Sequence, residues 1–205
     1  MTRFLTTLFV STFLYTGAAM AVEESKYTME TKAEHYEIRK YDATLVAEAK
    51  VEAGFEEAGS QAFRILADYI FGNNKAKTKL AMTAPVTQQP PSEKIAMTAP
   101  VSQVSTPGGF WVQFTMPAGF TLENIPEPSD PRVHLRMIPP RRMAVYRYSG
   151  TWSESRYTEK LAEFRKELEK NGVKTTGEPT FARFNPPFFP WFLRRNEIWL
   201  ELAKE

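Results

Sequence analysis

The residues best suited to chemistry lie between Phe188 and Arg195. This segment reads Phe-Phe-Pro-Trp-Phe-Leu-Arg-Arg, so four aromatic side chains and a leucine stand immediately before two arginines. Because loops normally face water, such a segment should either fold onto the body of the protein as a plug or line an apolar pocket. Arg194 and Arg195 would lie at the rim, where guanidinium groups bind carboxylates in a fork geometry. The segment therefore suits a flat apolar ligand that carries acid groups.

The other reactive residue types form no catalytic pattern and no metal site. The chain has no cysteine, which excludes disulfides, thiolate nucleophiles, cysteine zinc sites and c-type haem attachment. Its two histidines, His35 and His134, are too few for a metal cluster. The sequence also lacks a nucleophile elbow, a paired-histidine metal motif and a glycine-rich phosphate loop.

Length and charge limit the remaining classes of function. A chain of 205 residues supports one domain, with room for an internal duplication. Its 26 basic and 24 acidic residues give a net charge of +2, which argues against a nucleic-acid partner bound through phosphate neutralisation.

The N-terminal residues are typical of a targeting signal. Arg3 precedes a mainly apolar run from Phe4 to Tyr15, and Ala19-Met20-Ala21 is a small-x-small cleavage pattern. We expect cleavage before Val22, which leaves residues 22–205 as a single soluble domain that is exported: periplasmic in a bacterium, secreted otherwise. An uncleaved anchor is the alternative, although the run is short and interrupted by polar residues.

A repeated motif lies in the middle of the chain. Lys79–Gln88 recurs as Lys94–Gln103, and each copy contains Met-Thr-Ala-Pro-Val and alternates apolar with polar residues. This period predicts two half-buried strands, and Gln89-Pro90-Pro91-Ser92 between them predicts a turn, so the copies should form an antiparallel hairpin. The simplest interpretation is a core hairpin without chemistry.

The first predicted helix, Gly54–Gly72, carries two adjacent apolar stripes, more than one core face needs. The second stripe, which includes Phe63, Leu66 and Ile70, could widen the buried face or form one wall of a ligand groove. A second helix is predicted over Thr151–Asn171, with Ser153 as its cap. Before the first strand, Val22–Ala33 is polar and expected to be partly mobile.

The remaining segments alternate with the period of strands. They are 35–41, 43–53, 110–116, 133–138, 142–148, 179–185 and 196–202. The order strand, helix, strand, strand therefore occurs twice, and its first pass uses the repeated motif as the strand pair. We predict an α+β fold, a curved antiparallel sheet or distorted barrel with two flanking helices and a pseudo-twofold repeat.

Three motifs in this order resemble the SOUL family of haem-binding proteins. They are the paired Met-Thr-Ala-Pro-Val segments, Tyr36–Tyr41, and the stretch from Asn185-Pro186-Pro187 through Arg194-Arg195-Asn196-Glu197-Ile198-Trp199. The resemblance covers nearly the whole chain after the leader. It implies a distorted barrel with two helices that binds haem or another porphyrin.

The resemblance also implies where the porphyrin would bind, in a groove between the first helix and the aromatic loop. Its apolar contacts would come from Phe188, Phe189, Trp191 and Phe192. Its acid groups would meet Arg64, Lys77 and Lys79 on or near the helix, and Arg194 and Arg195 on the loop.

Strong ligation of haem iron is not expected. Some relatives carry histidine where this chain has Lys40, and strand alternation places His35 on the opposite face from that position. Hydrophobic and propionate contacts would then hold the ligand, with iron ligated weakly or not at all.

We expect a non-catalytic tetrapyrrole carrier or buffer. The alternative is a small-molecule binder or hydrolase, because a distantly similar fold, the effector-binding domain of the gyrase-inhibitor type, includes hydrolase-like members with a pocket glutamate. Glu197 would be that residue here. A third alternative is a protein-interaction module that uses the aromatic loop.

Overall fold

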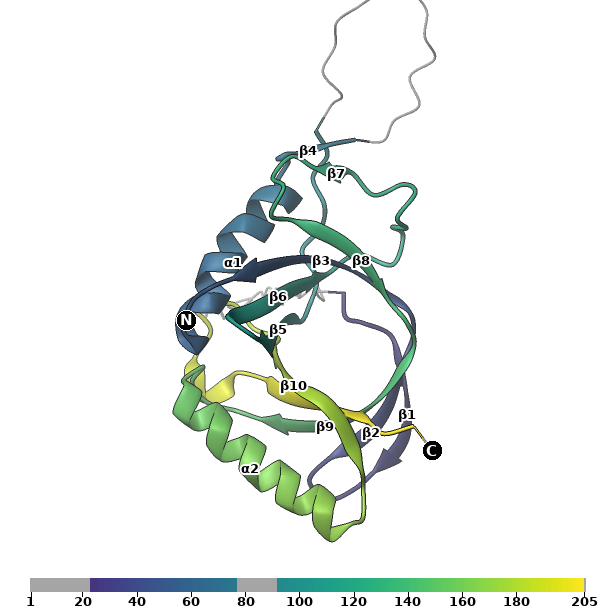
Figure 1. Cartoon of the computed structure of the whole chain (residues 1–205), viewed down its shortest axis with the longest axis vertical. Helices are drawn as coiled ribbons and strands as arrows, with labels where there is room; N and C mark the ends of the chain where they lie inside the picture. Colours follow the sequence, from purple (N-terminus) through teal and green to yellow (C-terminus); the bar gives the residue numbers. More distant parts are fainter. Residues whose placement is uncertain (1–22, 77–91, 205) are drawn as a thin grey trace, which may run out of the picture.

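The fold is a curled nine-stranded antiparallel sheet with two helices on its outer face (Figure 1). A second, two-stranded sheet pairs β4 (Asn74–Lys75) with β7 (Glu127–Pro128). The computed structural model describes residues 23–76 and 92–204. Within these residues the α+β curved sheet predicted from the sequence is confirmed. The long strands and the helices are β1 (Tyr27–Lys32), β2 (Glu37–Tyr41), β3 (Thr44–Val51), α1 (Phe55–Ile70), β5 (Val101–Thr106), β6 (Gly109–Thr115), β8 (His134–Ile138), β9 (Arg141–Tyr148), α2 (Glu154–Lys170), β10 (Thr175–Arg183) and β11 (Asn196–Leu202).

The strand order shows the predicted pseudo-twofold repeat. The nine strands follow the order β1-β2-β9-β11-β10-β5-β6-β3-β8. One half places β9, β11 and β10 beside one another, and the other places β3, β6 and β5 in the matching positions. The halves meet where β10 pairs with β5, with Thr180 opposite Val104 and Arg183 opposite Val101. This seam lies at the centre of the sheet.

Each half also lends a strand to the other. β2 precedes β3 in the chain but pairs with β9, with Glu37 opposite Val145. β8 precedes β9 but pairs with β3, with Thr44 opposite Ile138. The two halves are therefore joined by this exchange as well as by the central seam.

Helix α1 forms because its apolar residues recur every three to four positions. Ala58, Ala62, Leu66 and Ile70 are fully buried against β3 and β6. Glu56 and Glu57 in the first turn face the positive end of the helix dipole. Phe63 is only partly buried at the edge of this core, which leaves one face of its ring available to a neighbouring groove.

Helix α2 is held by a narrower stripe. Phe164 and Leu168 are its buried residues. They pack on Tyr36, on Ala144 of β9 and on Ile198 of β11. Ser153 is at the N-cap position, as predicted, although its hydroxyl makes no capping hydrogen bond. The solvated face of α2 is strongly charged, as its sequence suggested.

Two predicted elements differ from the structure. The second copy of the repeated motif is not a strand over 94–100, because its backbone bonds elsewhere: Ile95 N donates to Ile70 O and Ala99 N to Glu23 O. Strand β5 begins only at Val101, so β5 and β6 are the strand pair that follows α1. The first copy and the turn as far as Pro91 lie outside the described residues.

The other difference is at the start of the domain. The segment predicted to be partly mobile contains β1, an edge strand paired with β2 along Tyr27–Lys32. All six residues of β1 are exposed, so this edge strand has no buried face. No helix in the described part of the chain is long and apolar enough to cross a membrane.

Candidate functional site

An apolar groove of about 380 Å³ lies over one end of the central seam. One wall is α1 and the other is the chain that follows β10. A volume of this order suits a small organic ligand. Its lining residues are Gly59, Ser60, Phe63, Arg64, Met97, Thr98, Ala99, Val101, Trp152, Arg183, Phe184, Asn185, Pro186 and Pro187.

Arg183 is the main charged feature of this groove. It is the last residue of β10, and only 9% of it is exposed. Its Nη2 donates to Oε1 of Gln103 at 2.8 Å, while its Nε is buried and has no hydrogen-bond partner in the described part of the chain. Burial lowers the pKa of Arg183 to about 10, which leaves the guanidinium charged at neutral pH.

Two aromatic rings lie beside the guanidinium of Arg183. The guanidinium carbon of Arg183 lies 4.9 Å from the ring centre of Phe181 and 5.3 Å from that of Trp152. Cation–π contacts of this kind offset part of the cost of desolvation. Among the described residues no carboxylate lies within ion-pair distance of Arg183.

Gly59 makes room for the guanidinium. A Cβ atom at position 59 would overlap Nη1 of Arg183. Glycine in a helix interior costs about 0.5–1 kcal/mol relative to alanine. The close approach of Arg183 explains why α1 contains a glycine at this point.

Trp152 connects the groove to the aromatic loop. Its indole Nε1 donates to Asn196 Oδ1 at 2.9 Å, which fixes the ring ahead of α2. The guanidinium of Arg194 stacks on the same ring at 4.3 Å and donates to the carbonyls of Phe189 and Pro187. Arg194 therefore braces the loop and does not line the groove.

The predicted site residues are placed as follows. Arg64 lines the groove, whereas Lys77 and Lys79 lie outside the described residues. The groove ends at Pro187, so the residues after it, among them Phe189, do not line it. Phe188, at 88% exposed, and also Trp191 and Phe192 face solvent. The loop is thus not a buried plug, and its apolar side chains project beside the groove.

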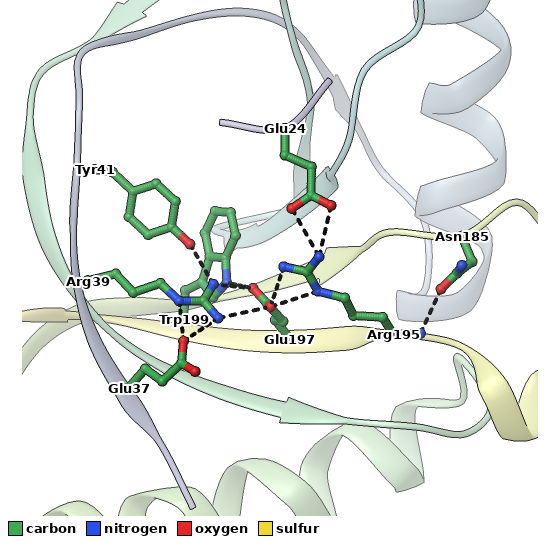
Figure 2. A network of polar contacts seen from close by, with 8 residues as sticks. All are labelled: Glu24, Glu37, Arg39, Tyr41, Asn185, Arg195, Glu197 and Trp199. Carbon is green, nitrogen blue, oxygen red and sulfur yellow. Dashed lines mark hydrogen bonds and ion pairs between the residues drawn. The ribbon is translucent and has the colours of Figure 1, made fainter. Parts of the chain in front are cut away.

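Arg195 belongs to a separate network inside the curled sheet (Figure 2). Its Nη1 contacts Glu24 at 2.8 Å and its Nη2 contacts Glu197 at 2.8 Å. On the other side of Glu197, Arg39 Nη1 lies 3.0 Å from the carboxylate, while Nη2 of the same guanidinium pairs with Glu37. The expectation that Arg195 is an open cation at the rim is not met, because protein carboxylates already occupy it.

Glu197 is the centre of this network. Its side chain is fully buried and accepts five hydrogen bonds from Arg39, Arg195 and the indole of Trp199. Desolvation and the neighbouring carboxylate act on Arg39, and the balance raises the pKa of Arg39. A carboxylate held in this way has no lone pair directed at a substrate.

A wider hollow of about 610 Å³ lies on the other side of the loop. Phe192, Leu193 and Arg194 form one edge of it, and His35 lies at the opposite edge. Most of its lining is polar or charged, and His35 is largely exposed. This hollow is a poorer match for an apolar ring than the groove beside α1.

The sequence reasoning did not identify Arg183, Trp152 or Gly59. The sequence offers no signal for Arg183, which ends a mixed polar and apolar strand and is followed by Phe184. The pairing of Arg183 with Gly59 had no signal, since it depends on how α1 crosses the seam. Phe63 lines the groove while Leu66 and Ile70 are buried, so the surplus stripe serves both the core and the groove.

The residues of the groove fit part of a haem. Its apolar walls suit the ring, and the incompletely bonded guanidinium of Arg183 suits an acid group. Met97 is the one sulfur-containing residue among the described lining residues, and none of these is histidine. The described residues contain no cluster of three or more histidine or acidic side chains that could hold a metal ion.

Solved structures share this fold at low sequence identity. The C-terminal domain of EcmrR is similar with a TM-score of 0.57 and 12% identity, over 87% of this chain and 99% of that chain. A structure described as a hydrolase from Listeria innocua matches with a TM-score of 0.53 and 11% identity, over 85% of this chain and 94% of that chain. At these identities the likeness shows the fold alone.

Sequence comparison gives a more specific result. No curated protein matches the chain. The family described as SOUL heme-binding protein matches residues 22–201, nearly the whole length of the chain. The matched range includes the groove, the aromatic loop and the Glu197 network. The chain therefore belongs to the SOUL haem-binding protein family.

Proposed function

We propose that this protein is an exported, non-catalytic tetrapyrrole carrier or buffer that holds its ligand in the groove between α1 and the residues after β10. The observation that carries the proposal is the groove itself, in which apolar walls surround a buried guanidinium that has no carboxylate partner among the described residues. A haem-binding family and a groove of this chemistry support the same ligand class.

The ligand would be held mainly by its ring and acid groups. Phe63 and Trp152 offer aromatic surface for a flat macrocycle, and Arg64 and Arg183 offer positive charge. When bound, haem supplies the iron and its redox chemistry. The residues of the chain bind and orient the ring and shield it from water.

Titration of the mature protein with haem and with metal-free protoporphyrin tests this proposal. We expect a red-shifted haem Soret band and quenching of tryptophan fluorescence, because Trp152 lines the groove. The Trp152→Phe variant should lose most of the quenching, whereas Trp111→Phe, on β6 outside the groove, should retain it. Similar affinities for haem and the metal-free ring would mean that iron is not recognised. If neither ligand binds, the proposal fails.

A hydrolase that uses Glu197 as its base receives less support. The carboxylate is fully buried and already accepts hydrogen bonds from two arginines and Trp199. A general base needs a lone pair within reach of the substrate proton. The similarity to a structure called a hydrolase concerns the fold alone.

Export is proposed from the sequence of residues 3–21, with cleavage before Val22. The described N-terminal residues are part of the fold, since Ala118 N donates to Glu23 and Arg195 pairs with Glu24.

A further inference from the structure

We propose that Arg183 is a carboxylate-binding residue at the inner end of the groove, and that the ligand must therefore present an acid group to the buried seam. This inference rests on the proposed ligand groove and specifies what the groove selects. The class of ligand is an apolar molecule with at least one carboxylate, whether a porphyrin diacid or a long-chain fatty acid.

Arg183 differs from two other arginines that lie at the sheet, the buried Arg39 of β2 and the partly buried Arg195 just before β11. Arg39 and Arg195 each contact two carboxylates, Glu197 in common and one more each. Arg183 has one neutral acceptor, the amide of Gln103, and no carboxylate among the described residues. Buried charges in proteins are normally paired, so an unpaired one marks a place where a partner of opposite charge is missing.

The guanidinium of Arg183 uses few of its hydrogen-bond donors. A guanidinium has five N–H groups, and the structure records one hydrogen bond from that of Arg183, made by Nη2. Nε is buried without a partner among residues 23–76 and 92–204, and Nη1 packs against Gly59, which lines the groove. Carboxylates accept two parallel hydrogen bonds from such a fork, which adds geometric selectivity to the charge attraction.

The position of Arg183 in the groove also favours a ligand with an acid group. Arg183 lines the same cavity as Phe63, Met97, Ala99 and Pro186, all of them apolar. Arg64 also lines it but is exposed on α1, so water screens its charge. A ligand with one acid end would therefore direct that end toward Arg183 and lay its apolar body along the walls.

A structural role for Arg183 predicts a different behaviour. If the arginine served only the fold, its removal would destabilise the protein and leave ligand selectivity unchanged. If it is held for a ligand, removal of a lone buried charge should leave the ligand-free protein at least as stable as wild type and should abolish selectivity for the acid. Stability and selectivity thus separate the two roles.

The test uses two pairs of probes with the mature protein: protoporphyrin against its dimethyl ester, and a long-chain fatty acid against the matching alcohol. For wild type we expect the acid of each pair that binds to bind at least tenfold more tightly than its neutral partner. In Arg183→Met this ratio should fall close to one, while affinity for the neutral partner is retained. Arg165→Met, on the exposed face of α2, should leave the ratio unchanged.

Two further variants keep the test independent of folding. Gly59→Ala retains the charge but displaces the guanidinium, so it should reduce the acid-to-neutral ratio. Arg183→Lys retains the charge without the fork and should keep a smaller preference for the acid. The thermal midpoint of Arg183→Met without ligand should equal or exceed that of wild type.

The outcomes distinguish this inference from the proposed function. If the porphyrin diester binds wild type as tightly as the diacid, tetrapyrrole binding stands and the role of Arg183 is refuted. If neither porphyrin binds but the fatty acid binds more tightly than its alcohol through Arg183, the carboxylate site stands and the tetrapyrrole function is refuted. Unchanged selectivity in Arg183→Met refutes the inference whichever ligand binds.

Discussion

Replacement of Glu197 by glutamine should destabilise the fold strongly, because this carboxylate neutralises two guanidinium groups inside the sheet. Its Oε1 accepts from Arg195 Nε and Nη2 and from Arg39 Nη2, and its Oε2 accepts from Arg39 Nη1 and Trp199 Nε1. An amide has one acceptor oxygen. In either orientation its NH₂ group would face at least two of these donors.

The expected magnitude follows from those contacts. A buried polar group left without its partner costs about 1–3 kcal/mol, and breaking a buried ion pair costs about 3–5 kcal/mol. Arg39 keeps Glu37 and Arg195 keeps Glu24, which limits the loss. We therefore expect Glu197→Gln to lower the free energy of unfolding by about 3–5 kcal/mol, equivalent to a fall in Tm of roughly 6–20 °C for a domain of this size.

Urea unfolding followed by circular dichroism and by tryptophan fluorescence measures this change. Glu163→Gln is a matched control, since Glu163 is an exposed residue of α2 that pairs with Lys160 and should change stability by less than about 1 kcal/mol. If Glu197→Gln unfolds within about 1 kcal/mol of wild type, the carboxylate is not the structural anion inferred here. A catalytic or ligand-binding role for Glu197 would then regain support.

Three other outcomes are expected. Burial raises the pKa of Tyr41, Tyr69 and Tyr148, so the folded state holds these protons more tightly than the unfolded chain; the contribution of these three groups to stability should be fully present below about pH 10 and be lost as the pH rises further, as absorbance at 295 nm and unfolding curves would record. Gly109→Ala should cost about 2–4 kcal/mol in chemical unfolding, because its φ is 145° and a Cβ would overlap the carbonyl of Val51, whereas Gly108→Ala, with open space around it, should cost about 1–2 kcal/mol. Intact mass of protein recovered from an exporting host should correspond to a chain that begins at Val22, and retention of residues 1–21 would contradict the predicted signal.

The helices and most strands could be predicted because their patterns reflect burial on one face. In α1 the spacing of Ala58, Ala62 and Leu66 follows the helical period, and each is fully buried. In β3 successive residues face either α1 or the interior of the sheet. The recurring order strand, helix, strand, strand also indicated the pseudo-twofold repeat, but the strand pair assigned to its first pass was wrong, because β5 and β6 take that place.

The repeated motif was misleading because alternation does not identify a partner. Ile95 is buried and Lys94 is exposed, as in a strand. The backbone of their segment nevertheless forms hydrogen bonds with the end of α1 and with the N-terminal residues, and not with a neighbouring strand of the sheet. The side chain of Asn74 stabilises this arrangement through hydrogen bonds to the backbone of Glu93 and Tyr69. Such long-range hydrogen bonds leave no periodic trace in the sequence.

The sequence left the site open, because the surplus apolar stripe of the first helix could mean either wider burial or one wall of a groove. A groove does lie beside this helix, and Arg64 lines it. The aromatic loop drew attention by composition, yet its rings lie beside the groove and Arg195 is bound to Glu197 and Glu24. Arg183 could not be separated from ordinary surface arginines, since its burial results from α1 and the seam together.

The strand exchange between the halves constrains the route by which the chain can fold. β2 is made early but finds its partner β9 only after β3, α1, β5, β6 and β8 have been made. Neither half can complete its hydrogen-bonded ladder from its own sequence, so fragments ending before β9 should not form stable domains. A protein built in this way would remain open until almost the entire polypeptide is present, which is compatible with passage through a membrane before folding.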